Sequence, residues 1–70
     1  MDMQPVESGN IESIGYDPES LKLAVKFKSG ATYHYSDVPA ETHAELMASD
    51  SKGGHLAVHV KSRHDYQRVA

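Results

Sequence analysis

The strongest constraint on this chain is a stretch of alternating residues that is followed by a glycine and a second alternating stretch. From Leu21 to Phe27 every second residue is apolar and lysine or alanine stands between. This is the pattern of a strand with one buried and one exposed face. Tyr33 and Tyr35 follow Gly30 at the same spacing. The two stretches therefore predict a β-hairpin.

The turn between the two stretches decides which of their faces coincide. A two-residue turn would need positive φ at Ser29, which serine adopts poorly. A three-residue turn with Gly30 in the left-handed region forms a G1 bulge and gathers the apolar side chains on one face. Because a slip of one residue would invert that face, we predict the second register. It pairs Phe27 with Ala31, Val25 with Tyr33, and Leu23 with Tyr35, and it leaves an open polar face of Lys22, Lys26, Thr32, His34 and Ser36.

Further elements flank the hairpin. Residues 11 to 17 alternate like a strand, but Ile11 is out of phase, which predicts either a bulge or the start of the strand near Glu12. Pro39 suits the first turn of a helix that reaches about Ser49 through a segment rich in Ala, Glu, Leu and Met. Residues 1 to 10 show little periodicity and are expected to form a loosely ordered lead-in.

Two interpretations exist for the last regular element. Leu56 and Val60 have the i,i+4 spacing of a helix, but with Val58 they also alternate like a strand. The length of the segment and the cap offered by Ser51 favour a helix from about Lys52 to Arg63. The chain is therefore predicted to be one α+β domain over residues 1–70, a three-stranded antiparallel β-meander packed against two C-terminal helices.

Composition restricts the function. Seventy residues without cysteine can form one small core but not a deep enzymatic cleft, and no Ser, His and acid are ordered as a triad, so we expect a protein that is not an enzyme. No run approaches the roughly 18 apolar residues of a membrane span, and no apolar leader lies near Met1. We therefore expect a cytoplasmic protein that does not enter a membrane.

Charge is unevenly distributed along the chain, whose net charge is −3. Residues 1–50 hold three lysines against nine acids, whereas residues 51–70 hold four cations and three histidines against Asp65. A nucleic-acid site is therefore expected in the C-terminal segment, although ordinary solvated side chains would give the same pattern. The candidates are Lys52, Lys61, Arg63, Arg68 and His59, with Lys22, Lys26 and His34 as a second surface.

The tyrosine pair allows a structural and a functional interpretation. Aromatic side chains two residues apart on a sheet can stack RNA bases. The predicted register instead turns Tyr33 and Tyr35 toward the core, where each ring needs only a partner for its hydroxyl group. We therefore predict that the pair is mainly structural.

The histidines and glycines of the C-terminal segment also allow a structural and a functional interpretation. His55 and His59 would share one side of a helix, but His64 would point elsewhere and cysteine is absent, so we predict no metal and no cofactor. Ser51 to Gly54 has the composition of an anion-binding turn but not the spacing of a phosphate loop. A close approach of another segment of the same chain explains better why position 53 is a glycine.

Residues spread over nearly the whole chain form an ordered pattern. They are Val6 to Ser8, Ile11, Ile14 to Asp17, Leu21, Val25, Phe27, Gly30, Tyr33-x-Tyr35, Val38-Pro39, Leu46, Ser51-x-Gly53, Leu56, His59-Val60-Lys61, Arg63 and Tyr66. In this order they resemble the KTSC domain family, a short module named for the C-terminus of some lysyl-tRNA synthetases and also found alone in small bacterial and phage proteins. His55, Ala57, His64 and Asp65 depart from the family pattern.

The resemblance implies no established activity, and the link to a tRNA-handling enzyme suggests RNA binding by association. The leading hypothesis is a non-enzymatic accessory module that binds RNA or tRNA weakly and in a salt-dependent manner. The alternative is a protein interaction module that docks through a sheet edge or a helix face.

Overall fold

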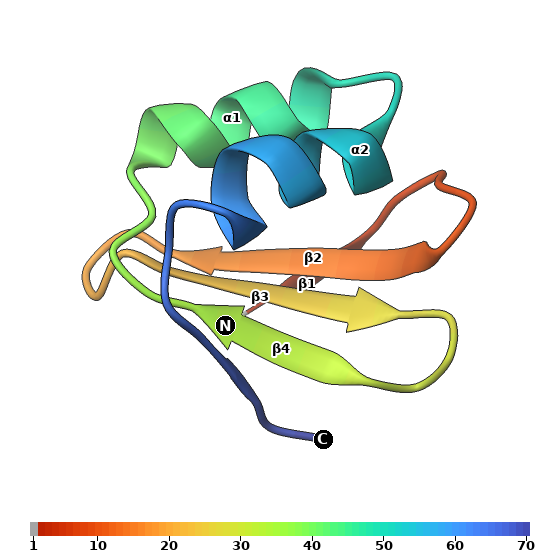
Figure 1. Ribbon diagram of the computed structural model, residues 1–70, viewed down its shortest axis with the longest axis horizontal. Helices are drawn as coiled ribbons and strands as arrows, with labels where there is room; N and C mark the ends of the chain where they lie inside the picture. The colour runs from red at the N-terminus through yellow and green to blue at the C-terminus, as the bar shows by residue number, and fades with distance from the viewer. Residues whose placement is uncertain (1) are drawn as a thin grey trace.

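The computed structural model describes residues 2–70, in which helices cover one face of an antiparallel sheet (Figure 1). The strands are β1 (Met3–Pro5), β2 (Ile11–Asp17), β3 (Lys22–Phe27), β4 (Thr32–Tyr35) and β5 (Tyr66–Arg68). The helical elements are α1 (Ala40–Ala48), α2 (Lys52–Leu56) and a π-helical turn, η1 (Ala57–Lys61), that continues α2. The strands lie in the order β1-β2-β3-β4-β5.

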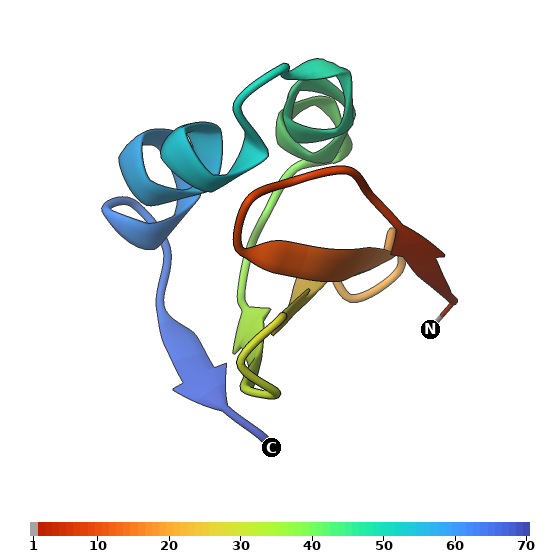
Figure 2. The same ribbon diagram turned by 90° about the vertical axis from the view of Figure 1, so that its right-hand side faces the viewer.

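The predicted α+β class and the antiparallel meander are confirmed, but the sheet has five strands rather than three. The predicted loose lead-in, residues 1 to 10, contains β1, in which Gln4 pairs with Ile14. Met1 lies outside the described residues. At the opposite edge of the sheet, Gln67 of β5 pairs with His34 (Figure 2). Both added strands have three exposed residues, too few for an alternating pattern. They form because a sheet edge offers unpaired backbone N–H and C=O groups.

The hairpin between β3 and β4 has the predicted register. The Phe27 N–H donates to the Ala31 carbonyl at 2.8 Å, and the Gly30 N–H donates to the Phe27 carbonyl at 2.9 Å. Gly30 has φ +97°, as a G1 bulge requires. The predicted pairs follow: Val25 with Tyr33 and Leu23 with Tyr35.

Of the two alternatives predicted near Glu12, a bulge or the start of the strand, the structure has the bulge, because β2 already begins at Ile11. The register of β2 against β3 shifts between Ile11 and Ser13. This shift allows both Ile11 and Ile14 to be fully buried although they are three residues apart. Glu12, the extra residue, extends to the surface and its carboxylate pairs with the Lys26 ammonium at 3.2 Å.

The helices differ from the prediction at their ends. Pro39 precedes α1 as an extended N-cap residue, with ψ 153°, instead of occupying the first turn. The second helical segment is confirmed as helix rather than strand, but it widens into η1 and ends at Lys61 instead of Arg63. Ser51 stands at the N-cap of α2 without a side-chain capping bond. Its own N–H donates to the hydroxyl of Ser49 at 3.1 Å.

The core lies between the sheet and the helical layer. Each helical element contributes one fully or almost fully buried side chain: Leu46 from α1, Leu56 from α2 and Val60 from η1. The rest of the core comes mainly from the sheet, from Ile11, Ile14, Leu23, Val25 and Tyr35, and from Val38 before α1. A core of nine side chains makes each of them important to a domain of this size.

A stacked pair of rings fixes α1 to the sheet. The His43 ring lies 4.6 Å from the Tyr16 ring with an interplanar angle of 9°. The Tyr16 hydroxyl donates to the Val38 carbonyl at 2.6 Å. Burial lowers the pKa of His43 below its usual 6.5, which means that the neutral ring is the form that packs here.

The protein is therefore expected to lose stability as the pH falls from about 7.5 to about 5.5. Because the pKa of His43 is lowered in the folded protein, the unfolded chain binds a proton at this residue more readily than the folded chain does. Lowering the pH through about 6.5, the pKa of histidine in an unfolded chain, therefore favours unfolding. Urea unfolding at the two pH values measures the change. His43→Gln should show a smaller pH dependence than the native chain, whereas His59→Gln, at an exposed position, should keep it. Equal pH dependence in His43→Gln and the native chain would contradict the assignment.

Candidate functional site

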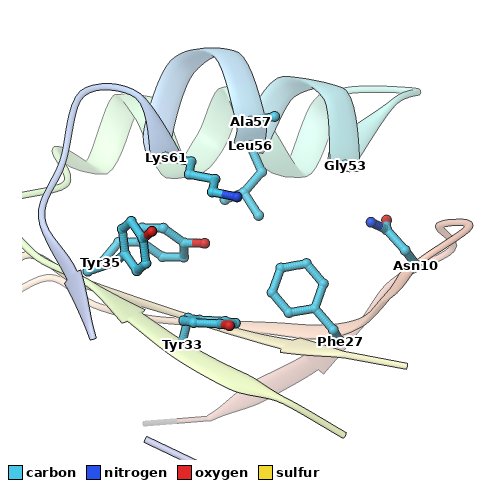
Figure 3. A pocket seen from close by; sticks show the side chains of 9 residues that line it. Asn10, Phe27, Tyr33, Tyr35, Gly53, Leu56, Ala57 and Lys61 are labelled. Atoms are coloured by element: carbon cyan, nitrogen blue, oxygen red, sulfur yellow. The ribbon is translucent and has the colours of Figure 1, made fainter. Parts of the chain in front are cut away.

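A cavity of about 180 Å³ lies between the sheet and the C-terminal helical segment (Figure 3). We call it the aromatic cavity, because four of its lining residues carry aromatic rings. It is lined by Asn10, Phe27, Tyr33, Tyr35, Gly53, Leu56, Ala57, Lys61 and Tyr66.

The four rings come from three neighbouring strands and contact one another in sequence. Phe27 of β3 meets Tyr33 of β4 edge to face, with centroids 5.7 Å apart. Tyr33 meets Tyr66 of β5 at 5.8 Å, and Tyr66 meets Tyr35 at 5.6 Å. The geometries are those that aromatic pairs prefer. The rings therefore form one connected apolar surface on the sheet side of the cavity.

The tyrosine hydroxyls of this cluster have no partner within residues 2–70. No side-chain hydrogen bond involves Tyr33, Tyr35 or Tyr66. Tyr35 is only 2% exposed, but its hydroxyl oxygen is not fully enclosed. Within residues 2–70, the one fully enclosed polar side-chain atom without a partner is Nε2 of His55. The Tyr35 hydroxyl therefore borders the cavity and is free to bond a ligand or water there.

Burial also raises the pKa of Tyr35, and the neighbouring Tyr33 and Tyr66 add to this effect. The Tyr35 hydroxyl is therefore protonated at neutral pH and can act as a hydrogen-bond donor.

Lys61 supplies a positive charge on the helical side of the cavity. Its side chain extends from η1 into the space between helix and sheet (Figure 3). The ion pair found within residues 2–70 joins Lys26 and Glu12, so no carboxylate of that part of the chain neutralises Lys61. The cavity thus combines aromatic faces, hydroxyl groups and a cation.

Two shallower depressions adjoin the aromatic cavity. One shares Asn10, Phe27 and Tyr33 with it and adds Lys28 from the hairpin turn. The other shares Lys61 and Tyr66 and adds Ser62, Arg63, His64 and Asp65. The three concavities therefore follow one another over the molecule, with basic side chains at both ends.

The structure brings only some of the predicted cations to this surface. Lys61 and Arg63 line the concavities. Arg68 lies opposite Tyr33 in the β4–β5 pair and therefore on the same sheet face as Tyr66, while its Nε donates to the Ala70 carbonyl at 3.0 Å. The Lys52 ammonium instead donates to the Ser49 carbonyl at 2.9 Å.

The remaining predicted cations lie elsewhere. His59 is exposed on η1 and its ring lies 4.4 Å from that of His55. Leu23, Val25 and Tyr35 point toward the helices. The side chains of neighbouring strand residues point to opposite faces, so the remaining three candidates lie on the other face of the sheet. They are Lys22, Lys26 and His34. Among residues 2–70, no group of three His, Cys, Asp or Glu side chains could hold a metal ion. No helix of that range is long and apolar enough to cross a membrane.

Several residues of these concavities were not predicted from the sequence. Asn10, which lines the aromatic cavity, comes from the loop before β2, and Lys28, which lines the adjoining depression, comes from the hairpin turn. No periodicity marks either residue. For Tyr66, the sequence indicated only that a large aromatic residue stands in a polar tail. The inward orientation of Tyr33 and Tyr35 is confirmed, but it does not make them purely structural, because the helices leave a cavity above their rings. Gly53 fits the predicted close approach: a Cβ there would lie 2.8 Å from Oδ1 of Asn10.

Comparison with known proteins agrees with this fold. A sequence model of the KTSC domain matches residues 7–66. The crystal structure of a KTSC domain protein from Yersinia pestis superposes with a TM-score of 0.94 at 35% identity, covering 99% of this chain and 97% of that chain. A protein of Tsukamurella paurometabola is 49% identical over 61 residues, which are 87% of this chain and 91% of that protein.

Two further relatives differ in length. An uncharacterized protein of Stutzerimonas stutzeri is 42% identical over 59 residues, 84% of this chain and 83% of the relative. A lysine–tRNA ligase of Nostoc sp. is 30% identical over 64 residues, 91% of this chain but only 11% of the ligase. The match to the domain model and the similarity of sequence and structure confirm the resemblance, and the chain belongs to the KTSC domain family.

Proposed function

We propose that this chain is a non-enzymatic accessory module that binds single-stranded RNA weakly through the aromatic cavity and the cations around it. The observation that carries the proposal is the position of Lys61, a cation without a carboxylate partner in the described residues, beside a connected row of aromatic rings. Proteins that bind single strands combine these two features, since bases stack on aromatic rings and phosphates pair with cations.

Charge placement supports the same surface. The chain as a whole is negative, so attraction of a phosphate backbone has to come from local cations. Lys61, Arg63 and Arg68 are grouped near the cavity by η1, the loop after it and β5. Lys28 adds a cation on the hairpin side. Lys26 contributes less to this proposal because the Glu12 carboxylate pairs with it on the opposite face of the sheet. Lys52 contributes less because it lines none of the three concavities, and its ammonium bonds the Ser49 carbonyl. Arg68 also donates to a carbonyl, but it lies opposite Tyr33 on the face of the rings.

The relationship to a lysine–tRNA ligase agrees with an RNA ligand. For this chain the relationship supports the class of ligand but not a particular RNA.

Salt dependence tests the proposal. A short single-stranded RNA and a tRNA are titrated into isotope-labelled protein at about 25 and about 200 mM salt, and amide chemical shifts are followed. If Lys61, Arg63 and Arg68 each contact a phosphate, the logarithm of affinity should fall with the logarithm of salt with a slope of about −2. The shifts should include residues between Ser51 and Arg68 as well as the cavity residues Phe27, Tyr33 and Tyr35.

Two matched double variants locate the surface. Lys61→Gln with Arg63→Gln should weaken RNA binding roughly tenfold at low salt and flatten the slope. Lys22→Gln with Lys26→Gln removes the same charge from the opposite face and should leave most of the affinity intact. No amide shift between Ser51 and Arg68 at low salt would contradict the proposal, and so would equal losses in the two double variants.

The competing proposal is a protein interaction through the free edge of β5. It is favoured by the exposure of Tyr66 and Val69, which are 50% and 47% exposed. An apolar contact of this kind would change little with salt, because it releases few counterions. The same titrations at two salt concentrations therefore separate the two proposals.

A further inference from the structure

We infer that the aromatic cavity takes one unpaired nucleobase, with the Tyr35 hydroxyl donating a hydrogen bond to the base and Lys61 pairing with the adjoining phosphate. This inference rests on the proposed function and specifies the group that enters the site.

The size of the cavity corresponds to one planar ring system. An apolar cavity of about 150 Å³ in another protein holds one benzene molecule, and the aromatic cavity measures about 180 Å³. Phe27, Tyr33, Tyr35 and Tyr66 line this space, and their rings meet one another edge to face or tilted. A single flat, polarisable group is the ligand that such a surface attracts. Two stacked groups would not fit.

The polar groups of the cavity favour an acceptor on that ring. The Tyr35 hydroxyl borders the cavity, is protonated at neutral pH and has no protein partner in residues 2–70. Without a ligand this hydroxyl can bond water, so a group that displaces the water has to offer an acceptor in its place. A nucleobase offers carbonyl and ring-nitrogen acceptors at its edge, whereas a purely hydrocarbon ring would leave the hydroxyl unsatisfied.

The charge of the cavity requires an anion attached to the ring. The Lys61 ammonium extends into the gap between η1 and the sheet (Figure 3), and Arg63 and His64 line the next depression. A base joined to a phosphate through a ribose supplies a flat group and an anion a few ångströms apart. A base in a double helix is stacked on both sides and could not enter, so the strand has to be unpaired at this position.

A cavity-filling variant tests whether a base enters the aromatic cavity and leaves the charge of the protein unchanged. Ala57 lines the cavity from η1 and is exposed enough to accept a larger side chain, so Ala57→Leu should fold and occupy the space. Ala44→Leu makes the same change at an exposed position of α1 outside the cavity. RNA affinity should fall roughly tenfold in Ala57→Leu, the loss of one stacked base, and stay unchanged in Ala44→Leu.

Removal of single groups gives two further readouts. Tyr35→Phe deletes only the unpartnered hydroxyl, so thermal stability should be unchanged while RNA affinity falls roughly fivefold. In the native complex, the ring protons of Phe27, the one phenylalanine of the chain, should shift and show contacts to base protons. An RNA carrying an abasic nucleotide at the bound position should bind as weakly as native RNA binds Ala57→Leu.

The ligand can be a free mononucleotide or one nucleotide of a strand, and separate titrations with uridine monophosphate, ribose 5-phosphate and a short uridine oligonucleotide distinguish the two. Phe27 ring shifts with the monophosphate but not with ribose 5-phosphate support base entry. Unchanged RNA affinity in Ala57→Leu and Tyr35→Phe would overturn the inference and leave the proposed function standing. Failure of the native chain to bind any RNA would overturn both.

Discussion

Replacing Leu46 by alanine is expected to lower the free energy of unfolding by about 2–5 kcal/mol, the range for a buried leucine. Leu46 is fully buried and is the one buried residue of α1, so its side chain joins that helix to the core. For a domain of this size each kcal/mol corresponds to roughly 4–8 °C in Tm. A drop of about 10–40 °C is therefore expected, which would leave a marginally stable domain largely unfolded at growth temperature.

Thermal unfolding followed by far-UV circular dichroism measures this effect. Val58→Ala is the control, because Val58 lies on η1 and is 60% exposed. It should change the free energy of unfolding by less than about 0.5 kcal/mol, as most surface substitutions do. If Leu46→Ala proved as stable as Val58→Ala, α1 could not pack on the sheet in the way described.

The central hairpin was predictable because it depends on local constraints. The alternation from Leu21 to Phe27 determines the face of β3, and the glycine after it selects one turn type and thereby one register. The phase of Ile11 relative to Ile14 indicated a bulge or a strand start near Glu12, and the structure has the bulge. In each case neighbouring residues restrict the backbone without reference to the rest of the chain.

The edge strands were missed because their causes are not local. β1 contains Pro5 and β5 has three exposed residues, so neither has a propensity or an alternation that predicts a strand. They pair because the central strands leave unbonded N–H and C=O groups at both edges. Backbone bonds such as that from the Ser36 N–H to the Asp65 carbonyl, 2.9 Å, depend on where the helical segment returns the chain.

The candidate site was only partly predictable for the same reason. The sequence identified Lys61, Arg63 and the tyrosine pair by residue type and spacing. It could not indicate that the Lys52 ammonium would bond the Ser49 carbonyl or that Glu12 would neutralise Lys26. The cavity itself depends on how far the helical segment stands above Tyr33 and Tyr35. That distance results from the packing of Leu56 and Val60, which no short pattern encodes.

Gly30→Ala is expected to destabilise the domain by about 1–2 kcal/mol, because an L-residue with a side chain is strained in the left-handed region. Gly30 has φ +97°, and a Cβ built there would meet no atom within 4 Å. The cost would therefore come from the backbone alone and not from a steric clash. The consequence reaches the site, since this glycine sets the register that turns Tyr33 and Tyr35 toward the aromatic cavity.

Gly9→Ala is a matched control for this substitution. A Cβ at Gly9 would also meet no atom within 4 Å, but Gly9 does not have positive φ, so alanine should be neutral or stabilising by about 0.4–1 kcal/mol. Urea unfolding of both variants should give opposite changes relative to the native chain. Cross-strand contacts between Val25 and Tyr33, followed by NMR, show whether Gly30→Ala keeps the register. Equal stability of the two variants would mean that the turn does not need a left-handed residue, and the orientation of the tyrosines would then require another cause.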